Sequence, residues 1–187
     1  MATIIVNDKD DFYYNSRKRK ARAIVLDENN NIYVCYMNGC YMLPGGGVEI
    51  DEHHYDTILR ELYEELGIKD ADVRYFMTVK YFHENYPKYN SKNTQTRLQI
   101  LYYYICKVDS KLIGQSHLTD YETNHNMEIR KYRIEDLIEE MEKYNDNPYK
   151  KFADKETLFI LDLYLKNLEI KQENQLTKVK KNVKINS

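Results

Sequence analysis

Apolar and polar side chains alternate through most of the N-terminal part of the chain, and this period of two predicts β-strands. The strongest segment is Thr96–Val108, which is apolar on both faces, as expected of a central strand covered on both sides. A β-branched run at Ala2–Asn7 predicts an edge strand or an arm that swaps between copies. The other predicted strands are Lys20–Asp27, Ile32–Met37, Asp72–His83 and Ile129–Arg133, and Cys40–Leu43 leads into a glycine-rich segment.

Three segments instead carry apolar residues at the three- to four-residue spacing of a helix. One is the second half of Gly46–Ile68, one is Ile134–Met141, and one is Ala153–Ile170, where leucines recur. The order of strand, hairpin, helix, strands and helix predicts a mixed sheet between helices. The predicted fold is therefore an α/β/α sandwich of the α/β (α+β) class, with an additional C-terminal helix.

The predicted organisation has one main domain. Residues 1–16 form an N-terminal arm, residues 17–147 the domain, residues 148–170 a C-terminal helix packed on it, and residues 171–187 a basic flexible tail. Dimerisation is the second interpretation of the C-terminal helix, so a homodimer stays open.

The helix within Gly46–Ile68 carries three carboxylates on one flank. Around the helix axis, Glu64 lies about 40°, Glu61 about 100° and Glu65 about 140° from Arg60, beside an apolar stripe. Like charges at this spacing repel each other, so a helix that keeps them usually gains something in return. Mg²⁺ and Mn²⁺ prefer carboxylate oxygens, so a metal site is the obvious gain, and Arg60 can pair with Glu64 one turn away. The alternative is an ordinary solvated surface helix.

The segment before this helix, Pro44-Gly45-Gly46-Gly47, cannot be regular helix or central strand. Its glycines let the backbone approach a ligand closely. Asp51 or Glu52 can cap the helix, and Gly67 is a natural helix stop.

Together with its lead-in from Leu43, the stretch Gly46–Ile68 resembles the complete Nudix box. The pattern is glycine, five residues, glutamate, seven residues, then Arg-Glu-Leu-x-Glu-Glu-x-Gly-Ile. The matching positions are Gly46, Glu52, Arg60, Glu61, Leu62, Glu64, Glu65, Gly67 and Ile68. By the order of its elements, the wider resemblance covers about Arg17–Glu142. It implies an α/β/α sandwich and a Mg²⁺- or Mn²⁺-dependent pyrophosphohydrolase that cleaves the diphosphate linkage of a nucleoside diphosphate derivative by water attack at phosphorus.

The resemblance also implies a metal site and further acids. The expected metal ligands are Glu61, Glu64 and Glu65, with carbonyl oxygens of Gly45 or Gly46. Arg60 would hold this set in place. Family members often recruit another acid outside the box as base or ligand, and here Glu122 is the first candidate and Glu128 the second.

Substrate contacts are expected from the glycines and from a basic run. Gly46 and Gly47 are candidates, and Arg22 or Arg19 can present a bidentate guanidinium to a phosphate. The run Ser16-Arg17-Lys18-Arg19-Lys20 is more often a solvated strand entry than a phosphate contact. The polar segment from Glu84 to Asn93 is long enough for a substrate lid.

The sequence does not select one substrate. Oxidised nucleoside triphosphates, nucleotide sugars, dinucleoside polyphosphates and capped RNA ends all remain candidates. The alternative to an enzyme is a nucleotide-sensing binding module, which predicts a damaged box, whereas all four charged positions in Arg60-Glu61-x-x-Glu64-Glu65 are intact.

Composition sets further bounds. Hydrophobic residues make up 42% of the 187 residues, enough for a packed core, and the net charge of −2 gives no global basic field for nucleic acid. Three cysteines without paired spacing fit free thiols in a reducing compartment. The sequence has no signal-peptide pattern and no apolar run long enough to span a membrane, so a cytoplasmic protein is expected.

Overall fold

The computed structural model of the chain describes residues 3–7, 13–87, 93–143 and 148–185. The chain divides into two compact units, Met1–Arg133 and Ile134–Ser187. The first unit contains the sheet and the glycine-rich segment, and the second unit contains two helices.

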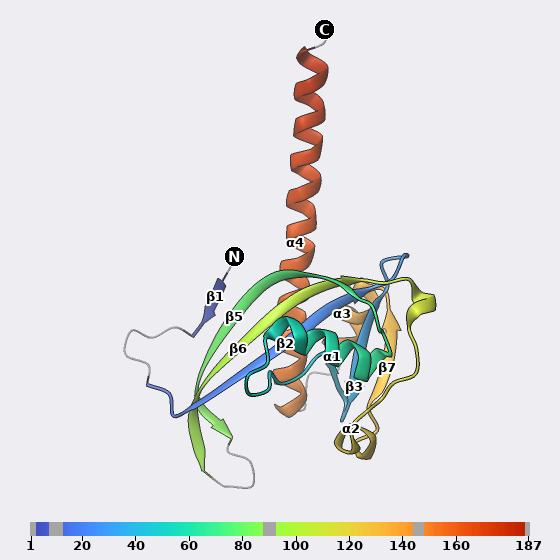
Figure 1. Cartoon of the computed structure of the whole chain (residues 1–187). Coiled ribbons are helices and arrows are strands. Elements are labelled where there is room, and N and C mark those ends of the chain that lie inside the picture. Colours follow the sequence, from blue (N-terminus) through green and yellow to red (C-terminus); the bar gives the residue numbers. More distant parts are fainter. Residues whose placement is uncertain (1–2, 8–12, 88–92, 144–147, 186–187) are drawn as a thin grey trace. The chain divides into compact units, whose positions relative to one another are not determined.

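Seven strands of the described residues form one mixed sheet (Figure 1). They are β1 (Thr3–Val6), β2 (Ser16–Leu26), β3 (Ile32–Met37), β4 (Cys40–Met42), β5 (Asp72–Pro87), β6 (Thr94–Lys107) and β7 (Glu128–Tyr132). Their order is β1-β5-β6-β2-β3-β4, and β7 pairs with β3. β1 is parallel to β5 and β2 is parallel to β6, whereas the other pairs are antiparallel. The mixed sheet, the edge position of the first strand and the inner position of β6 confirm the predictions.

Helix α1 (His54–Leu66) covers one face of the sheet, called here the α1 face (Figure 1). Its apolar stripe, which contains Ile58, Leu62 and Leu66, is buried. The stripe packs against side chains of the two central strands, among them Ala21, Ala23, Val25, Tyr104 and Cys106. Burying each large aliphatic side chain contributes roughly 1.5–3 kcal/mol, so this contact fixes α1 on the sheet.

The ends of α1 differ in part from the prediction. His53 is the N-cap, and its Nδ1 accepts a backbone N–H of the first turn at 3.2 Å. Asp51 and Glu52 were the predicted caps, and this prediction is wrong, because Asp51 has left-handed backbone (φ 64°) and the chain enters the helix two residues later. Gly67 ends the helix with φ 66°, as predicted.

The long strands extend beyond their predicted ends. β2 begins at Ser16, because it pairs with β6 along its whole length. β5 continues to Pro87 and β6 begins at Thr94, so residues 84–87 of the predicted loop from Glu84 to Asn93 belong to a strand, and the β5–β6 register shifts between His83 and Tyr86. Residues 88–92 of that predicted loop lie outside the described residues. The short helices η1 (Ser110–Leu112) and α2 (Asp120–Asn124) were not predicted.

The second unit contains α3 (Ile134–Glu142) and α4 (Pro148–Ile185), which contact each other. The predicted helix at Ile134–Met141 is confirmed. The predicted end of the C-terminal helix at Ile170 is wrong, because α4 continues through most of the segment expected to be a flexible tail. No proline or glycine follows Pro148, so the sequence has no strong helix breaker there. The mixed sheet with helices and the C-terminal helix confirm the α+β class, while packing of α4 on the main domain stays a prediction.

Two isoleucines near α1 test the importance of its buried stripe. Ile58 is 0% exposed and Ile50 is 92% exposed. We expect Ile58→Ala to lower the free energy of unfolding by about 2–5 kcal/mol, because it leaves a cavity between helix and sheet. The matched Ile50→Ala change should alter it by less than about 0.5 kcal/mol. Urea unfolding followed by circular dichroism measures both, and equal losses would contradict the packing described.

Candidate active site

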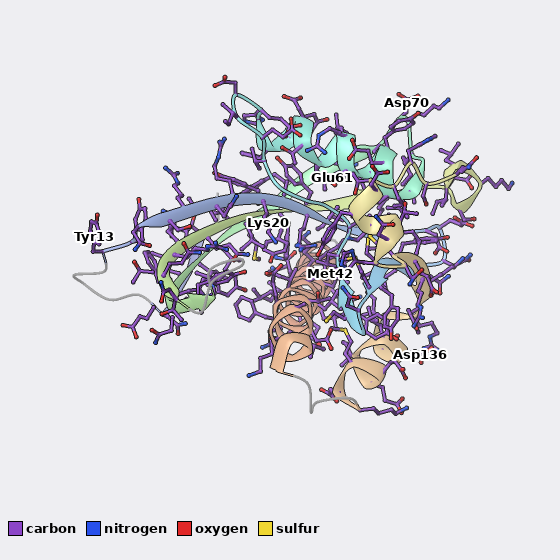
Figure 2. The ribbon with its side chains drawn as sticks, turned by 90° about the horizontal axis from the view of Figure 1, so that it is seen from below. Tyr13, Lys20, Met42, Glu61, Asp70 and Asp136 are labelled. Atoms are coloured by element: carbon purple, nitrogen blue, oxygen red, sulfur yellow. The ribbon has the colours of Figure 1, made fainter. Side chains whose placement is uncertain are left out.

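Three carboxylates project from one flank of α1, at Glu61, Glu64 and Glu65. The flank lies beside the buried stripe, so Glu61 and Glu65 are drawn into the protein and are only 7% and 4% exposed. Glu64, further round the helix, is 30% exposed at its side chain. Figure 2 shows Glu61 on the side of α1 that is turned toward the sheet. The predicted set of acids is therefore together, with two members buried and one in contact with solvent.

Arg60 connects these carboxylates to the segment before the helix. Its Nη1 donates to Glu61 Oε1 at 2.9 Å and to Glu64 Oε2 at 3.0 Å. Its Nε donates to Glu52 Oε1 at 3.0 Å, and this contact holds the pKa of Glu52 at about 2. Its Nη2 reaches the carbonyl oxygen of Gly47 at 3.3 Å. The predicted Arg60–Glu64 pair is confirmed, and Glu52 proves to be a partner of Arg60.

The glycine loop, defined as Pro44–Val48, lies along β2. The Ala21 N–H donates to Gly46 O at 3.0 Å, and the Val48 N–H donates to Arg19 O at 3.0 Å. β3 pairs with only the last residues of β2, so this edge of β2 is open for the loop. Backbone hydrogen bonds therefore fix the loop against the same strand that packs under α1.

Two glycines of the loop allow it to touch the carboxylates. The Gly45 N–H donates to Glu65 Oε2 at 2.7 Å. Gly45 has φ 129°, and a Cβ there would lie 2.1 Å from the Ala21 carbonyl oxygen. A Cβ on Gly46 would lie 2.2 Å from Glu61 Oε1, whereas a Cβ on Gly47 would have no heavy atom within 4 Å. Glycine is thus required at Gly45, whereas a side chain at Gly46 would have to displace the Glu61 carboxylate.

Arg22 supports the loop from the other face of the sheet. The side chain is buried, and its Nη1 donates to Leu43 O at 2.6 Å and lies 3.5 Å from Gly45 O. Its neighbours Ala21 and Ala23 belong to the core under α1, so alternation along β2 directs Arg22 to the opposite face. The contact that the structure gives Arg22 is with the loop backbone, and the predicted contact with substrate stays a prediction.

Burial decides the protonation of the inner carboxylates. It raises the pKa of Glu65 to about 8, and the neighbouring charge of Glu61 acts in the same direction, although the Gly45 N–H opposes it. Burial also raises the pKa of Glu61, with Arg60 opposing the shift. Without a further cation, Glu65 holds a proton at neutral pH.

Sequence reasoning missed Cys35, which lies beside Glu65. The residue is 1% exposed, and its thiol is close enough to Glu65 for each group to shift the pKa of the other. Burial raises the pKa of this thiol, so it stays protonated. The alternation of side chains along the strand could have placed Cys35 on the α1 face, because Tyr33, two residues earlier, is in the core under α1.

The two further acids proposed from the sequence lie outside the helix. Glu122 is in the first turn of α2, where its Oε2 accepts hydrogen bonds from the backbone N–H and the hydroxyl of Thr119, each at 2.8 Å. Its charge is close enough to raise the pKa of Glu61. Glu128 instead forms an ion pair with Arg130 at 2.8 Å. Glu122 is therefore better placed than Glu128 to act with α1.

Among the residues that the structure describes, no three His, Cys, Asp or Glu side chains converge as a ready metal-binding group. The Arg60 contacts explain this, because they hold Glu61 and Glu64 toward the guanidinium. The donor set still suits a hard divalent cation, since it consists of carboxylate and backbone carbonyl oxygens. Burial raises the pKa values of Glu61 and Glu65, so a bound cation would stabilise their ionised forms.

A model of the NUDIX domain matches residues 16–154, which contain α1, the glycine loop and strands β2 to β7. The chain belongs to the Nudix family. The match confirms the resemblance to this family, and the carboxylates and the glycine loop lie inside the matched residues.

Two curated relatives of this Nudix chain are named 8-oxo-dGTP diphosphatase. The protein from Proteus vulgaris is 35% identical over 54 residues, which are 26% of this chain and 48% of the relative. The protein from Buchnera aphidicola subsp. Schizaphis graminum is 31% identical over 71 residues, which are 35% of this chain and 55% of the relative. The chain thus spans about half the length of the curated relatives it matches.

Solved MutT structures are also similar to the chain. One, from work on Aliivibrio salmonicida and Vibrio cholerae, has a TM-score of 0.48 and 18% identity, covering 77% of this chain and 94% of that one. Another, from Bacillus halodurans, has the same score and identity, with 65% and 72% covered. Separately, no helix in the described ranges is long and apolar enough to cross a membrane.

Proposed function

We propose that the chain is a hydrolase of phosphoric anhydrides that cleaves the diphosphate linkage of a nucleoside diphosphate derivative with Mg²⁺, or with Mn²⁺ in its place. The observation that carries the proposal is the pair of buried carboxylates, Glu61 and Glu65, in contact with a glycine loop that a neighbouring strand fixes. The names of the curated relatives support the reaction and suggest 8-oxo-dGTP as the first substrate to test.

The metal ligands in this proposal are Glu61, Glu64 and Glu65, completed by a backbone carbonyl. Both candidate carbonyls already accept a hydrogen bond, Gly46 O from the Ala21 N–H at 3.0 Å and Gly45 O from Arg22 Nη1 at 3.5 Å. Gly45 is the better candidate, because its contact is the longer of the two. A divalent cation here would offset the cost of burying two ionised carboxylates and displace the Glu65 proton.

The bound metal would neutralise phosphate oxygens and lower the pKa of a water molecule for attack at phosphorus. Arg60 positions Glu61 and Glu64, while the Gly45 N–H positions Glu65. Glu122 is the candidate base, with one carboxylate oxygen already fixed by Thr119.

The proposed substrate contacts come from the loop and β2. The backbone at Gly46 and Gly47 can approach a phosphate closely, because neither residue has a side chain. Arg22, which donates to the carbonyl oxygens of Leu43 and Gly45, is the candidate cation next to this loop.

A catalytically silent nucleotide-sensing module is the second candidate. The observation in its favour is that Arg60 engages Glu61 and Glu64, so the described residues contain no preassembled metal group. Hydrolysis requires a cation to gather the carboxylate oxygens that Arg60 does not contact, whereas a sensing module does not.

Glu64→Gln tests the proposed hydrolysis. We expect phosphate or pyrophosphate release from at least one member of a panel of nucleoside diphosphate derivatives, including 8-oxo-dGTP, in the presence of Mg²⁺. The variant should reduce turnover by about 100-fold or more, because it removes a metal-binding oxygen. Asp56→Asn, on the exposed first turn of α1, should retain turnover. A folded wild type that binds Mg²⁺ but turns over no compound would favour the sensing module.

The glycine loop offers a matched pair for metal binding. In Gly46→Ala the new methyl group would displace the Glu61 carboxylate, and we expect Mg²⁺ affinity to fall by about 10- to 100-fold. Gly47→Ala adds the same methyl group in open space and should leave Mg²⁺ affinity unchanged. Isothermal titration calorimetry measures both, and an unchanged affinity in Gly46→Ala would remove Glu61 from the metal site.

A further inference from the structure

A run of basic residues lies on the same strand as the anchor of the glycine loop. Arg17, Lys18, Arg19 and Lys20 are consecutive in β2. The loop pairs with the last two residues of this run, through Arg19 O and through a bridge between Lys20 and Gly47. The basic run therefore begins where the candidate active site ends.

Neighbouring strands add to this charge. Arg97 of β6 pairs with Ser16, and Lys80 of β5 pairs with Ile100 beside Arg19. We name the three segments Ser16–Lys20, Lys80–Tyr86 and Thr94–Gln99 the basic extension. It contains six lysines and arginines and a single acid, Glu84, whereas the whole chain has a net charge of −2. Positive charge is therefore concentrated in one part of the first unit, although the net charge of the chain is slightly negative.

The basic extension also carries aromatic rings. The guanidinium carbon of Arg97 lies 3.8 Å from the centroid of the Tyr86 ring, and its Nε donates to Ser16 Oγ at 3.3 Å. His83 lies 5.2 Å from Tyr86 and 6.0 Å from Tyr81 between ring centroids, the latter pair being stacked. These contacts make a row of planar groups along the β5–β6 hairpin.

Strand register places the rings and part of the charge on one face. Gln99 pairs with both Lys18 and Tyr81, and Arg97 pairs with both Ser16 and His83. Directly opposed residues share a face of a sheet, so Lys18, Lys20, Arg97 and the rings lie together, opposite the α1 face. Figure 1 shows β2, β5 and β6 continuing past α1, and Figure 2 shows Lys20 between Tyr13 and Glu61. Lys18 is exposed and Arg97, His83 and Tyr86 are partly so, whereas Tyr81 is buried and packs against His83.

We propose that the basic extension binds single-stranded nucleic acid. Lysines and arginines along a strand match a chain of phosphates, and unpaired bases stack on tyrosine, histidine and arginine planes. The four strand steps from Ser16 to Lys20 span about 13 Å, so the basic side chains are spread along a line and not gathered at one point. This proposal rests on the proposed function. The substrate would then be a polynucleotide whose terminal diphosphate linkage reaches the glycine loop. Water cleaves the P–O–P bond there and gives two phosphate products.

The first test is binding of short, fluorescently labelled oligouridylate to the full chain, followed by anisotropy. Lys18→Gln, Lys20→Gln and Arg97→Gln combined should weaken binding at least about tenfold. They should also reduce the slope of log affinity against log salt by about 2, since each lost phosphate contact removes about 0.7. The control combines Lys69→Gln, Lys107→Gln and Lys111→Gln, which remove the same charge at exposed positions elsewhere. Equal loss in the control, or no binding by the wild type, would overturn the proposal.

The second test separates stacking from charge. Tyr86→Leu should weaken single-strand binding by about tenfold, as expected for one stacked base, with little change in salt dependence. A duplex of the same length should bind more weakly than the single strand, and equal binding would overturn the proposal. The affinities of oligouridylate and oligodeoxythymidylate are measured in the same way, and the tighter binder identifies the polynucleotide as RNA or DNA. Nucleic-acid binding without turnover of any diphosphate would count against the proposed hydrolase alone, and turnover without such binding would count against this surface alone.

Discussion

The burial of two carboxylates on α1, at Glu61 and Glu65, is the constraint on which the rest of the site depends. An isolated ionised carboxylate is costly to bury, so each must be paired, hydrogen-bonded or protonated. The chain uses all three means, because Arg60 contacts Glu61, the Gly45 N–H binds Glu65, and the pKa of Glu65 rises to about 8. The negative charge of the two carboxylates is therefore only partly balanced by Arg60. A divalent cation bound here would balance the rest.

Strand β2 is the element that brings the parts of this site together. Its small residues Ala21 and Ala23 let α1 pack closely on the sheet, and the backbone of Ala21 holds the glycine loop through Gly46. Its basic first half continues the same edge away from the loop. One strand therefore fixes the helix, the loop and the charged surface relative to one another within the first unit.

The sequence predicted what depends on local spacing and failed where tertiary contacts decide. Helical period placed the acids of α1 on one flank, and Gly67 ended the helix as expected. The N-cap prediction failed because the backbone at Asp51 turns left-handed before the helix begins. Cys35 was missed because its proximity to Glu65 joins residues far apart in the chain. The basic run Ser16–Lys20 was seen in the sequence but interpreted as a solvated strand entry, because its neighbours on β5 and β6 follow only from strand pairing.

The most direct test of the central claim is the proton balance of metal binding. Calorimetric titration of the metal-free chain with Mn²⁺ at pH 7, in two buffers of different ionisation enthalpy, gives the number of protons released. We expect release approaching one proton per site, because Glu65, with a pKa of about 8, is protonated before the cation binds and ionised afterwards. The release should diminish above pH 8 and be lost in Glu65→Gln. Metal binding with no proton release at pH 7, or with the same release in Glu65→Gln, would contradict a cation seated on the buried carboxylates.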